Sequence, residues 1–185
     1  MPLVKSGGIV EDPFVRIADD APVPEGIAVI VSGARFLADA EALTQRATAV
    51  GVVWPNNRPV AELAPYLSRL ALVALMFPSF RDGRGYSQAR VLRERYGYTG
   101  ELRATGQVLR DQFLFLLRAG FDSFEVSKEA DVAAFAESIR RFDVFYQPTG
   151  DGRPTAYRRR LGRAFASVQP ARTLMPCDTD ARTGS

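Results

Sequence analysis

The stretch LVALMFPSFRDGRGYSQARVLRERYGYTGELRAT, residues 72–105, decides the fold. It begins with an apolar run over 72–77 that a proline ends, and a glycine-containing loop follows. Apolar residues at helical spacing then predict a helix over 86–96, and a second strand is expected over 101–105. Two strands joined through a helix predict a βαβ unit, in which the strands run parallel and the crossover is right-handed.

The same alternation extends to both sides of this unit. Ser87 and Gly97 are expected as the N-cap and C′ residues of its helix. Further strands are predicted over 27–31, 50–54 and 121–126, further helices over 34–47, 60–70, 108–119 and 130–142, and a last extended piece over 143–147. Strands alternating with helices predict one α/β domain over 26–147, with a mainly parallel sheet of about five strands. A half-barrel and a flavodoxin-like arrangement both fit this pattern.

The two ends of the sequence lack the strand-helix alternation of the middle. Residues 1–25 contain short extended pieces around two glycines and predict an N-terminal hairpin or extended arm. Residues 148–185 are rich in Gly, Pro and Arg and lack a sustained amphipathic period, so a disordered, mobile basic tail is expected. The arginines of this tail, with Tyr157 nearby, are either solvated or contact nucleic acid or an acidic protein. A formal net charge of only +3 makes nucleic acid an unlikely partner.

Composition excludes several classes of chemistry. The sequence contains no histidine, which rules out Ser-His and Cys-His catalysis and histidine-ligated metals in this chain. Its single cysteine, Cys177, cannot form an internal disulfide or an ordinary zinc site, so no metal is expected and a reducing cytoplasm fits best. The longest strongly apolar stretch, 113–117, is far shorter than the ~20 residues that span a bilayer. We therefore expect a soluble cytoplasmic protein without a membrane segment.

The predicted strand over 101–105 is unusual because it alternates polar and apolar residues, whereas a central parallel strand is normally apolar throughout. Together with the neighbouring strand it predicts a polar sheet face that carries Glu101, Arg103 and Glu125. This face is either the inner surface of an incomplete barrel or an edge exposed to solvent. Arg103 is either part of a buried ion pair with Glu101 or Glu125, or a functional residue.

Two strand-loop-helix segments, after residues 77 and 105, are expected to lie side by side at the carboxyl ends of their strands, where ligands of α/β sheets bind. Backbone N–H groups and forked guanidinium donors suit an oxyanion, although the glycine spacing fits neither a Walker loop nor a dinucleotide fingerprint. The alternative is that the arginines pair locally, Arg81 with Asp82 and Arg90 with Glu94. The candidate anion-binding residues are Arg81, Asp82, Arg84, Tyr86, Ser87, Arg90, Arg103, Arg110 and Asp111.

The run FPSFRDGRGYSQARVLRERYGYTGELRATGQVLRDQFLFLLRAGFDSFEV, residues 77–126, resembles a bacterial family named domain of unknown function 934. Its members are labelled as oxidoreductases of sulfite reduction. The resemblance implies an accessory protein of assimilatory sulfite reduction and cysteine biosynthesis, which binds a sulfur oxyanion or the sulfite reductase through the arginine-rich block. It also leaves open an oxidoreductase with a flavin or nicotinamide cofactor. A third interpretation makes the helix over 108–119 a homodimer surface.

Overall fold

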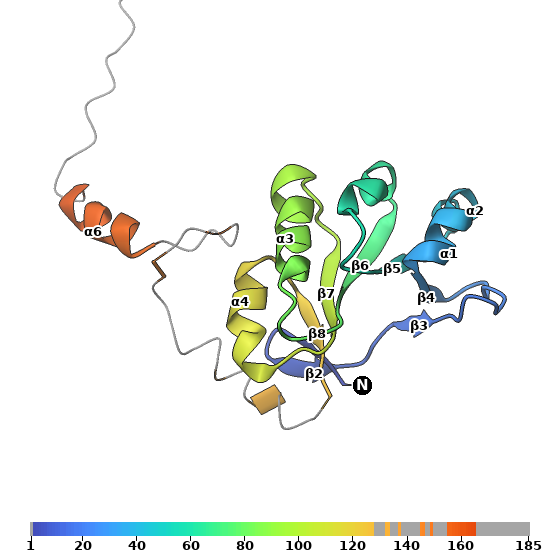
Figure 1. Ribbon diagram of the computed structural model, residues 1–185, viewed down its shortest axis with the longest axis horizontal. Helices are drawn as coiled ribbons and strands as arrows, with labels where there is room; N and C mark the ends of the chain where they lie inside the picture. Colours follow the sequence, from blue (N-terminus) through green and yellow to red (C-terminus); the bar gives the residue numbers. More distant parts are fainter. Residues whose placement is uncertain are drawn as a thin grey trace, which may run out of the picture.

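The computed structural model describes residues 2–127, 132–133, 137, 145–146, 149 and 155–165, and these form an α/β structure around one sheet (Figure 1). The sheet has eight strands in the order β2-β1-β8-β7-β6-β5-β4-β3. Strands β3 to β8 run parallel, whereas β1 pairs antiparallel with both β2 and β8, so the sheet is mixed and larger than the five strands expected. The strands are β1 Leu3–Lys5, β2 Gly8–Val10, β3 Phe14–Arg16, β4 Ala28–Ser32, β5 Val50–Trp54, β6 Leu70–Phe77, β7 Glu101–Gly106 and β8 Ser123–Glu125.

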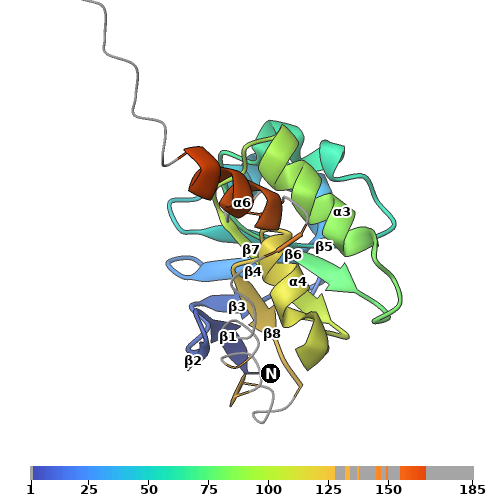
Figure 2. The same cartoon turned by 90° about the vertical axis from the view of Figure 1, so that its left-hand side faces the viewer.

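Short helices connect the parallel strands and cover one face of the sheet (Figure 2). They are α1 Gly33–Ala38, α2 Ala40–Thr44, the 3-10 helix η1 Val60–Tyr66, α3 Arg84–Arg90, the π-helix η2 Val91–Arg95, the 3-10 helix η3 Arg110–Gln112 and α4 Phe113–Arg118. The helix expected over 34–47 is divided at Asp39, and the one over 60–70 is a 3-10 helix that contains Pro65, whose ring nitrogen has no hydrogen to donate.

The start and end of the α3–η2 helix differ in how well the sequence predicts them. Ser87 is not the N-cap, because it lies inside α3 and Gly83 precedes the helix. Asp82, which precedes Gly83, accepts a hydrogen bond from the Arg84 backbone N–H at the start of the helix, at 3.2 Å. Gly97 follows the last helical turn with a φ of +61°, which confirms its predicted C′ position.

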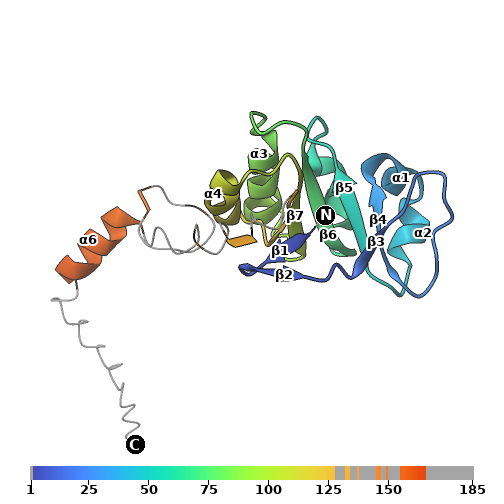
Figure 3. The ribbon, with the colours of Figure 1, turned by 90° about the horizontal axis from the view of Figure 1, so that it is seen from below.

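The N-terminal segment is part of the sheet rather than a separate arm. The predicted hairpin forms from β1 and β2, but β2 and β3 lie at opposite edges of the sheet and only residues 11–13 join them. Four residue steps reach at most about 14 Å, whereas the edges of a flat eight-stranded sheet would lie about 33 Å apart. The sheet must therefore curve, and Figure 3 shows the linker crossing from β2 to β3.

One contact across the inside of the sheet demonstrates the curvature directly. Arg16 on β3 donates to Glu125 on β8 at 2.9 Å, although five strand spacings separate these strands in the sheet order. The architecture is a half-barrel, and the flavodoxin-like alternative is wrong because such a sheet is open and covered by helices on both faces.

Buried side chains divide into two groups according to the face of the sheet. The larger cluster lies between the sheet and its helices and includes Phe36, Trp54, Leu92, Phe113 and Phe124. A small apolar cluster on the inner face contains Ile30, Val53, Leu72 and Ala74, with Phe14 packed against it. Strands β5 and β6 are therefore apolar on both faces, as buried parallel strands normally are.

The segment expected to form the helix over 108–119 buries part of its apolar surface. Phe113, Leu114 and Leu116 contribute to the interior, while Phe115 is 62% exposed. Burial against the sheet thus explains most of the apolar surface of this helix. A homodimer through its exposed side stays a prediction.

Only parts of the C-terminal third are described. The helix predicted over 130–142 and Cys177 lie outside the described residues, apart from positions 132–133 and 137. In the extended piece expected over 143–147, Phe145 pairs in parallel with Thr155. The tail is not wholly without structure, because residues Ala156–Phe165 form helix α6, in which Tyr157 and Leu161 are one turn apart. None of the described helices is long and apolar enough to span a bilayer.

Gly106, which ends β7, is expected to be the least replaceable glycine of the carboxyl-end loops. Its φ is +96°, and an added Cβ would lie 2.4 Å from the backbone oxygen of Phe77. We expect Gly106→Ala to lower the free energy of unfolding by about 3 kcal/mol or more, measured by urea denaturation.

Gly26→Ala is the matched control. Gly26 also has a positive φ, +76°, but an added Cβ there would meet nothing within 4 Å. This variant should lose only about 1–2 kcal/mol, the cost of the left-handed conformation alone. Equal losses in the two variants would show that the close approach to Phe77 does not matter.

Candidate functional site

The two strand-loop-helix segments singled out in the sequence lie side by side, as predicted. Phe77 and Gly106 are paired in the β6–β7 register, and the Gln107 backbone N–H donates to the Phe77 carbonyl at 2.8 Å. The side chain of Gln112 donates from Nε2 to the Phe80 carbonyl at 3.0 Å. These bonds bring the loop after β6 and the loop after β7 together at the carboxyl edge of the sheet.

Arg84 forms an ion pair with Asp82, a carboxylate of the same loop region. Arg84 donates from Nε to Asp82 Oδ1 at 2.9 Å and from Nη2 to Oδ2 at 2.6 Å. These side-chain bonds, and the Arg84 backbone N–H, hold the pKa of Asp82 well below its ordinary value. The local partner of Asp82 is thus Arg84 rather than Arg81. The start of α3, which favours negative charge, already faces an anionic group.

Other predicted site residues also find partners nearby. Arg90 donates to Glu94 one turn later at 3.1 Å, which matches the predicted local pairing. The Tyr86 ring packs edge-on against Phe77, with 5.5 Å between ring centroids. Burial, together with the negative charge of Asp111, raises the pKa of Tyr86 to about 12. The two loops therefore bring Tyr86 and Asp111 close together, and the Tyr86 phenol is protonated at neutral pH.

Arg81 and Arg110 behave differently from the other candidate arginines. Neither pairs with a carboxylate in the described part of the chain, and both are exposed. The Arg81 guanidinium lies over the Phe80 ring, 5.4 Å from its centroid. Phe80 is 45% exposed and Leu109 is 41% exposed. We call Phe80, Arg81, Leu109 and Arg110 the carboxyl-end patch.

Two buried amides lie beneath this region. Gln88 donates from Nε2 to the carbonyls of Pro55 and Arg58, at 3.2 and 2.8 Å, while its Oε1 accepts no hydrogen bond from the described residues. Asn56 is only 7% exposed, and its Nδ2 makes no hydrogen bond of normal geometry with the described residues. It is nevertheless close enough to Asp82 to contribute to the lowered pKa of that carboxyl.

Arg103 lies elsewhere, on the inner face of the half-barrel, where it is fully buried. It donates to both oxygens of Asp12, from Nη1 at 2.6 Å and from Nη2 at 3.0 Å, and from Nε to Glu101 at 3.1 Å. Its Nη1 atom is also 3.5 Å from Glu125. The structure thus shows the predicted ion pairing of Arg103, with Asp12 as a further partner that the sequence did not suggest.

The polar sheet face is a closed network of charges. Lys5 binds Glu101 and Arg16 binds Glu125, each at 2.9 Å, so that three cations meet three carboxylates. Two hydroxyl groups complete it: Ser123 donates to Glu101 at 2.7 Å and Thr105 to Glu125 at 2.5 Å. The solvent-exposed edge considered for β7 is wrong, because β7 lies between β6 and β8. We call these eight residues, Lys5, Asp12, Arg16, Glu101, Arg103, Thr105, Ser123 and Glu125, the inner network.

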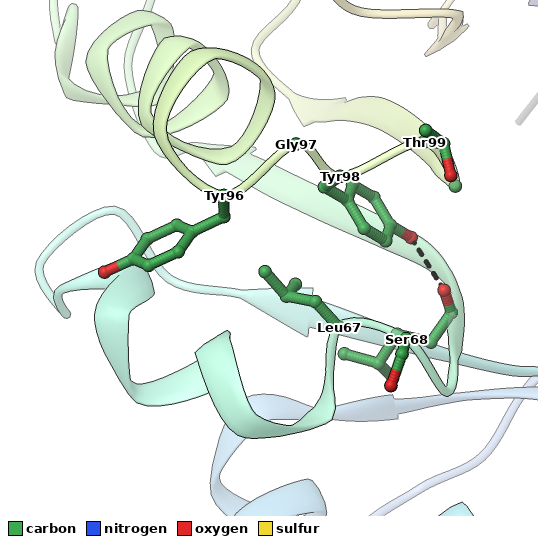
Figure 4. Close-up of a pocket in the computed structure, with 8 residues that line it drawn as sticks. Leu67, Ser68, Tyr96, Gly97, Tyr98 and Thr99 are labelled. Atoms are coloured by element: carbon green, nitrogen blue, oxygen red, sulfur yellow. Dashed lines mark hydrogen bonds between the residues drawn. The ribbon is translucent and has the colours of Figure 1, made fainter.

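A cavity that the sequence reasoning missed lies at the opposite, amino edge of the sheet, before β6 and β7 (Figure 4). Its volume is about 390 Å³, and its lining residues are Leu67, Ser68, Leu70, Tyr96, Gly97, Tyr98, Thr99 and Gly100. The only sequence signal for it is the Tyr-Gly-Tyr-Thr-Gly run directly after the helix. The described residues contain no group of three or more acidic or cysteine side chains placed to hold a metal ion.

Replacing Arg103 tests whether the inner network supports the fold. In Arg103→Met three carboxylates lose their central cation, and we expect a loss of about 3–5 kcal/mol in the free energy of unfolding. The control is Arg90→Met, which removes an exposed pair with Glu94 and should change stability by less than about 0.5 kcal/mol. Urea denaturation of both variants measures the difference, and similar small losses would contradict the structural role.

The inner network also predicts how stability depends on pH. Burial by itself raises the pKa of Asp12 and of Glu101. Hydrogen bonds outweigh this effect and lower both pKa values. Asp12 accepts from Arg103, and Glu101 accepts from Ser123, Lys5 and Arg103. Their stabilisation is therefore complete above the ordinary carboxyl pKa of about 4 and is lost as the pH falls through the lower folded values. Acid denaturation of Asp12→Asn should show a shallower fall below about pH 4 than the parent protein. Glu25→Gln, which changes an exposed carboxylate outside the network, should leave the slope unchanged.

Comparison with known proteins assigns the chain to a family. The family model described as "Bacterial protein of unknown function (DUF934)" matches residues 51–157, more than half of the chain. The matched stretch contains β6 to β8, all but the first residue of β5 and the carboxyl-end patch, while Asp12 and the rest of the N-terminal segment precede it. No curated protein matches the chain. The protein therefore belongs to the bacterial DUF934 family.

Proposed function

We propose that this protein is an accessory protein of assimilatory sulfite reduction that docks onto the sulfite reductase through the carboxyl-end patch. The observation that carries the proposal is the distribution of arginine partners. Ion pairs with carboxylates of the chain itself are made by Arg84, Arg90 and Arg103. Among the described residues, no carboxylate pairs with Arg81 or Arg110. The pathway comes from the resemblance of residues 77–126 to proteins labelled for sulfite reduction.

The composition of the patch favours a protein partner over a small anion. Exposed aromatic and arginine side chains are enriched among the residues that dominate binding energy at protein interfaces. Phe80 and Leu109 are both about two-fifths exposed, and each is adjacent in sequence to an arginine that pairs with no carboxylate among the described residues. A partner surface with acidic groups around an apolar depression would complement them.

The patch is held in place before any partner arrives. The Gln112 side chain bridges its two halves, because Nε2 donates to the Phe80 carbonyl at 3.0 Å and Oε1 accepts from the Leu109 backbone N–H at 3.4 Å. Stacking of Arg81 on Phe80 restricts that guanidinium as well. Such pre-organisation lowers the entropy that binding must overcome.

Binding to purified assimilatory sulfite reductase, measured by biolayer interferometry, tests the proposal. We expect saturable binding that weakens as salt is added, because rim charges are screened. Phe80→Ala and Arg81→Ala should each weaken binding by tenfold or more, which corresponds to about 1.4 kcal/mol.

The matched controls are Arg90→Ala, an exposed arginine already paired with Glu94, and Ile27→Ala, an exposed apolar residue before β4. Both should bind like the parent protein. Absence of saturable binding to the reductase, or an equal loss of affinity in the control variants, would contradict the proposal.

A second candidate is oxyanion binding at the carboxyl edge of the sheet, favoured by the buried Asn56 in the loop after β5, whose Nδ2 makes no hydrogen bond of normal geometry with the described residues. Calorimetric titration with sulfite and sulfate decides it, since Asn56→Leu should abolish any heat that the parent protein shows. The cofactor-dependent oxidoreductase stays a prediction from the resemblance. The absorption spectrum of the purified protein reveals a bound flavin if there is one.

A further inference from the structure

The cavity at the amino edge of the sheet combines an aromatic ring with hydroxyl groups. Of its lining residues, Leu67, Leu70 and Tyr98 are largely buried, Tyr96 is half-buried, and the exposed Ser68 and Thr99 add hydroxyl groups. In Figure 4 the side chains of Tyr96 and Tyr98 leave the loop after η2 in different directions, and the dashed line joins the Tyr98 hydroxyl to the carbonyl at the start of β6. More of the accessible lining is polar than apolar, so a ligand in this cavity would meet hydroxyl and backbone polar groups as well as the Tyr96 ring.

The walls of this cavity are fixed by interactions within the protein. Arg93 donates to the carbonyls of Tyr98, Gly100 and Gly120, and its Nη2 binds Asp122 at 2.6 Å. Tyr98 closes the other side, because its hydroxyl donates to the Leu70 carbonyl at 3.1 Å. The cavity is therefore formed before a ligand enters.

Gly100 allows this arrangement to form. A Cβ at this position would lie 2.3 Å from the Tyr98 hydroxyl, so any larger residue would displace the ring that forms the wall. The tyrosine and the glycine two positions later are thus coupled. Their close approach makes the cavity a built feature of the loop rather than a gap between loosely packed elements.

No charged side chain is among the lining residues, but two exposed arginines are adjacent to them in the sequence. Arg69 is exposed between the lining residues Ser68 and Leu70. The Arg95 guanidinium lies over the Tyr96 ring, 5.8 Å from its centroid. In the described part of the chain neither arginine pairs with a carboxylate, so both remain available to an anion.

From the walls and the rim together, we propose that the cavity binds a planar aromatic ring that carries an anionic group, the chemistry of a nucleoside monophosphate. The ring lies against the half-buried Tyr96, where stacking favours a flat surface. The phosphate lies at the rim, where Arg69 and Arg95 supply forked donors. The site is independent of the proposed docking function, because β6, with eight residues, separates it from the carboxyl-end patch by roughly 25 Å.

Calorimetric titrations with AMP, UMP, adenosine and inorganic phosphate test both parts of the ligand. At least one of the two nucleotides should bind in the micromolar to low millimolar range. Adenosine and phosphate should each bind at least tenfold more weakly than the better nucleotide. Binding of adenosine as tight as that of AMP would overturn the anionic part of the proposal, and binding of phosphate as tight as that of the nucleotides would overturn the aromatic part.

Variants separate the wall from the rim. Tyr96→Ala should weaken nucleotide and adenosine binding alike, by tenfold or more. The double variant Arg69→Ala, Arg95→Ala should reduce nucleotide affinity to the level of adenosine while leaving adenosine binding unchanged. Ser68→Trp fills the cavity and should abolish binding of all these probes.

Tyr146→Ala and Arg81→Ala are the matched controls, because Tyr146 is 89% exposed outside the cavity and Arg81 lies at the other edge of the sheet. Both should bind nucleotide like the parent protein, and circular dichroism should show that every variant remains folded. No binding of either nucleotide at millimolar concentration, or an equal loss in the controls, would overturn the proposal. Arg81→Ala also keeps the two functions apart, since it should weaken reductase binding only.

Discussion

The three-residue linker between β2 and β3 is the constraint on which the rest of the structure depends. It joins opposite edges of an eight-stranded sheet, so the sheet has to curve until those edges come within reach of residues 11–13. Curvature turns one face of the sheet inward and leaves the other for the helices. The linker also places Asp12 within hydrogen-bond distance of Arg103. Covalent geometry and a buried ion pair thus reinforce each other.

The arginines of this chain divide into those that hold the protein together and those that face outward. Arg103 and Arg93 each bind several groups from segments far apart in the sequence, and both are wholly or largely buried. Burying a guanidinium is tolerable here because its N–H groups donate to carboxylate or carbonyl oxygens. Arg81 and Arg110 have no such partners in the described residues. The arginines, all of which are suited to anions by their chemistry, therefore divide into structural ones and accessible ones.

The two edges of the sheet differ in chemistry for a physical reason. At the carboxyl edge the start of α3 favours negative charge, and Asp82 supplies it from the preceding loop. Exposed apolar and arginine side chains then remain for a larger partner. At the amino edge the chain leaves η2 through Gly97 and re-enters the sheet through Gly100, and these glycines allow two tyrosines to enclose a cavity. Ligand sites of parallel sheets are usually sought at the carboxyl edge alone.

The sequence by itself determined the repeating strand-helix pattern and the parallel strands β4 to β8. It also determined the C′ glycine at 97 and the meeting of the loops after Phe77 and Gly106. These features could be predicted because the hydrophobic period and the turn residues are local signals. The sequence also identified Glu101, Arg103 and Glu125 as a polar face, since alternation along a strand is visible in the letters. Only the tertiary structure decided which groups meet that face. Asp12 and Arg16 reach it from about 90 to 110 residues away, through a curvature that no local pattern encodes. The cavity beside Tyr96 likewise exists only because two segments 30 residues apart pack at one edge of the sheet, and such contacts follow from the packed fold rather than from neighbouring letters.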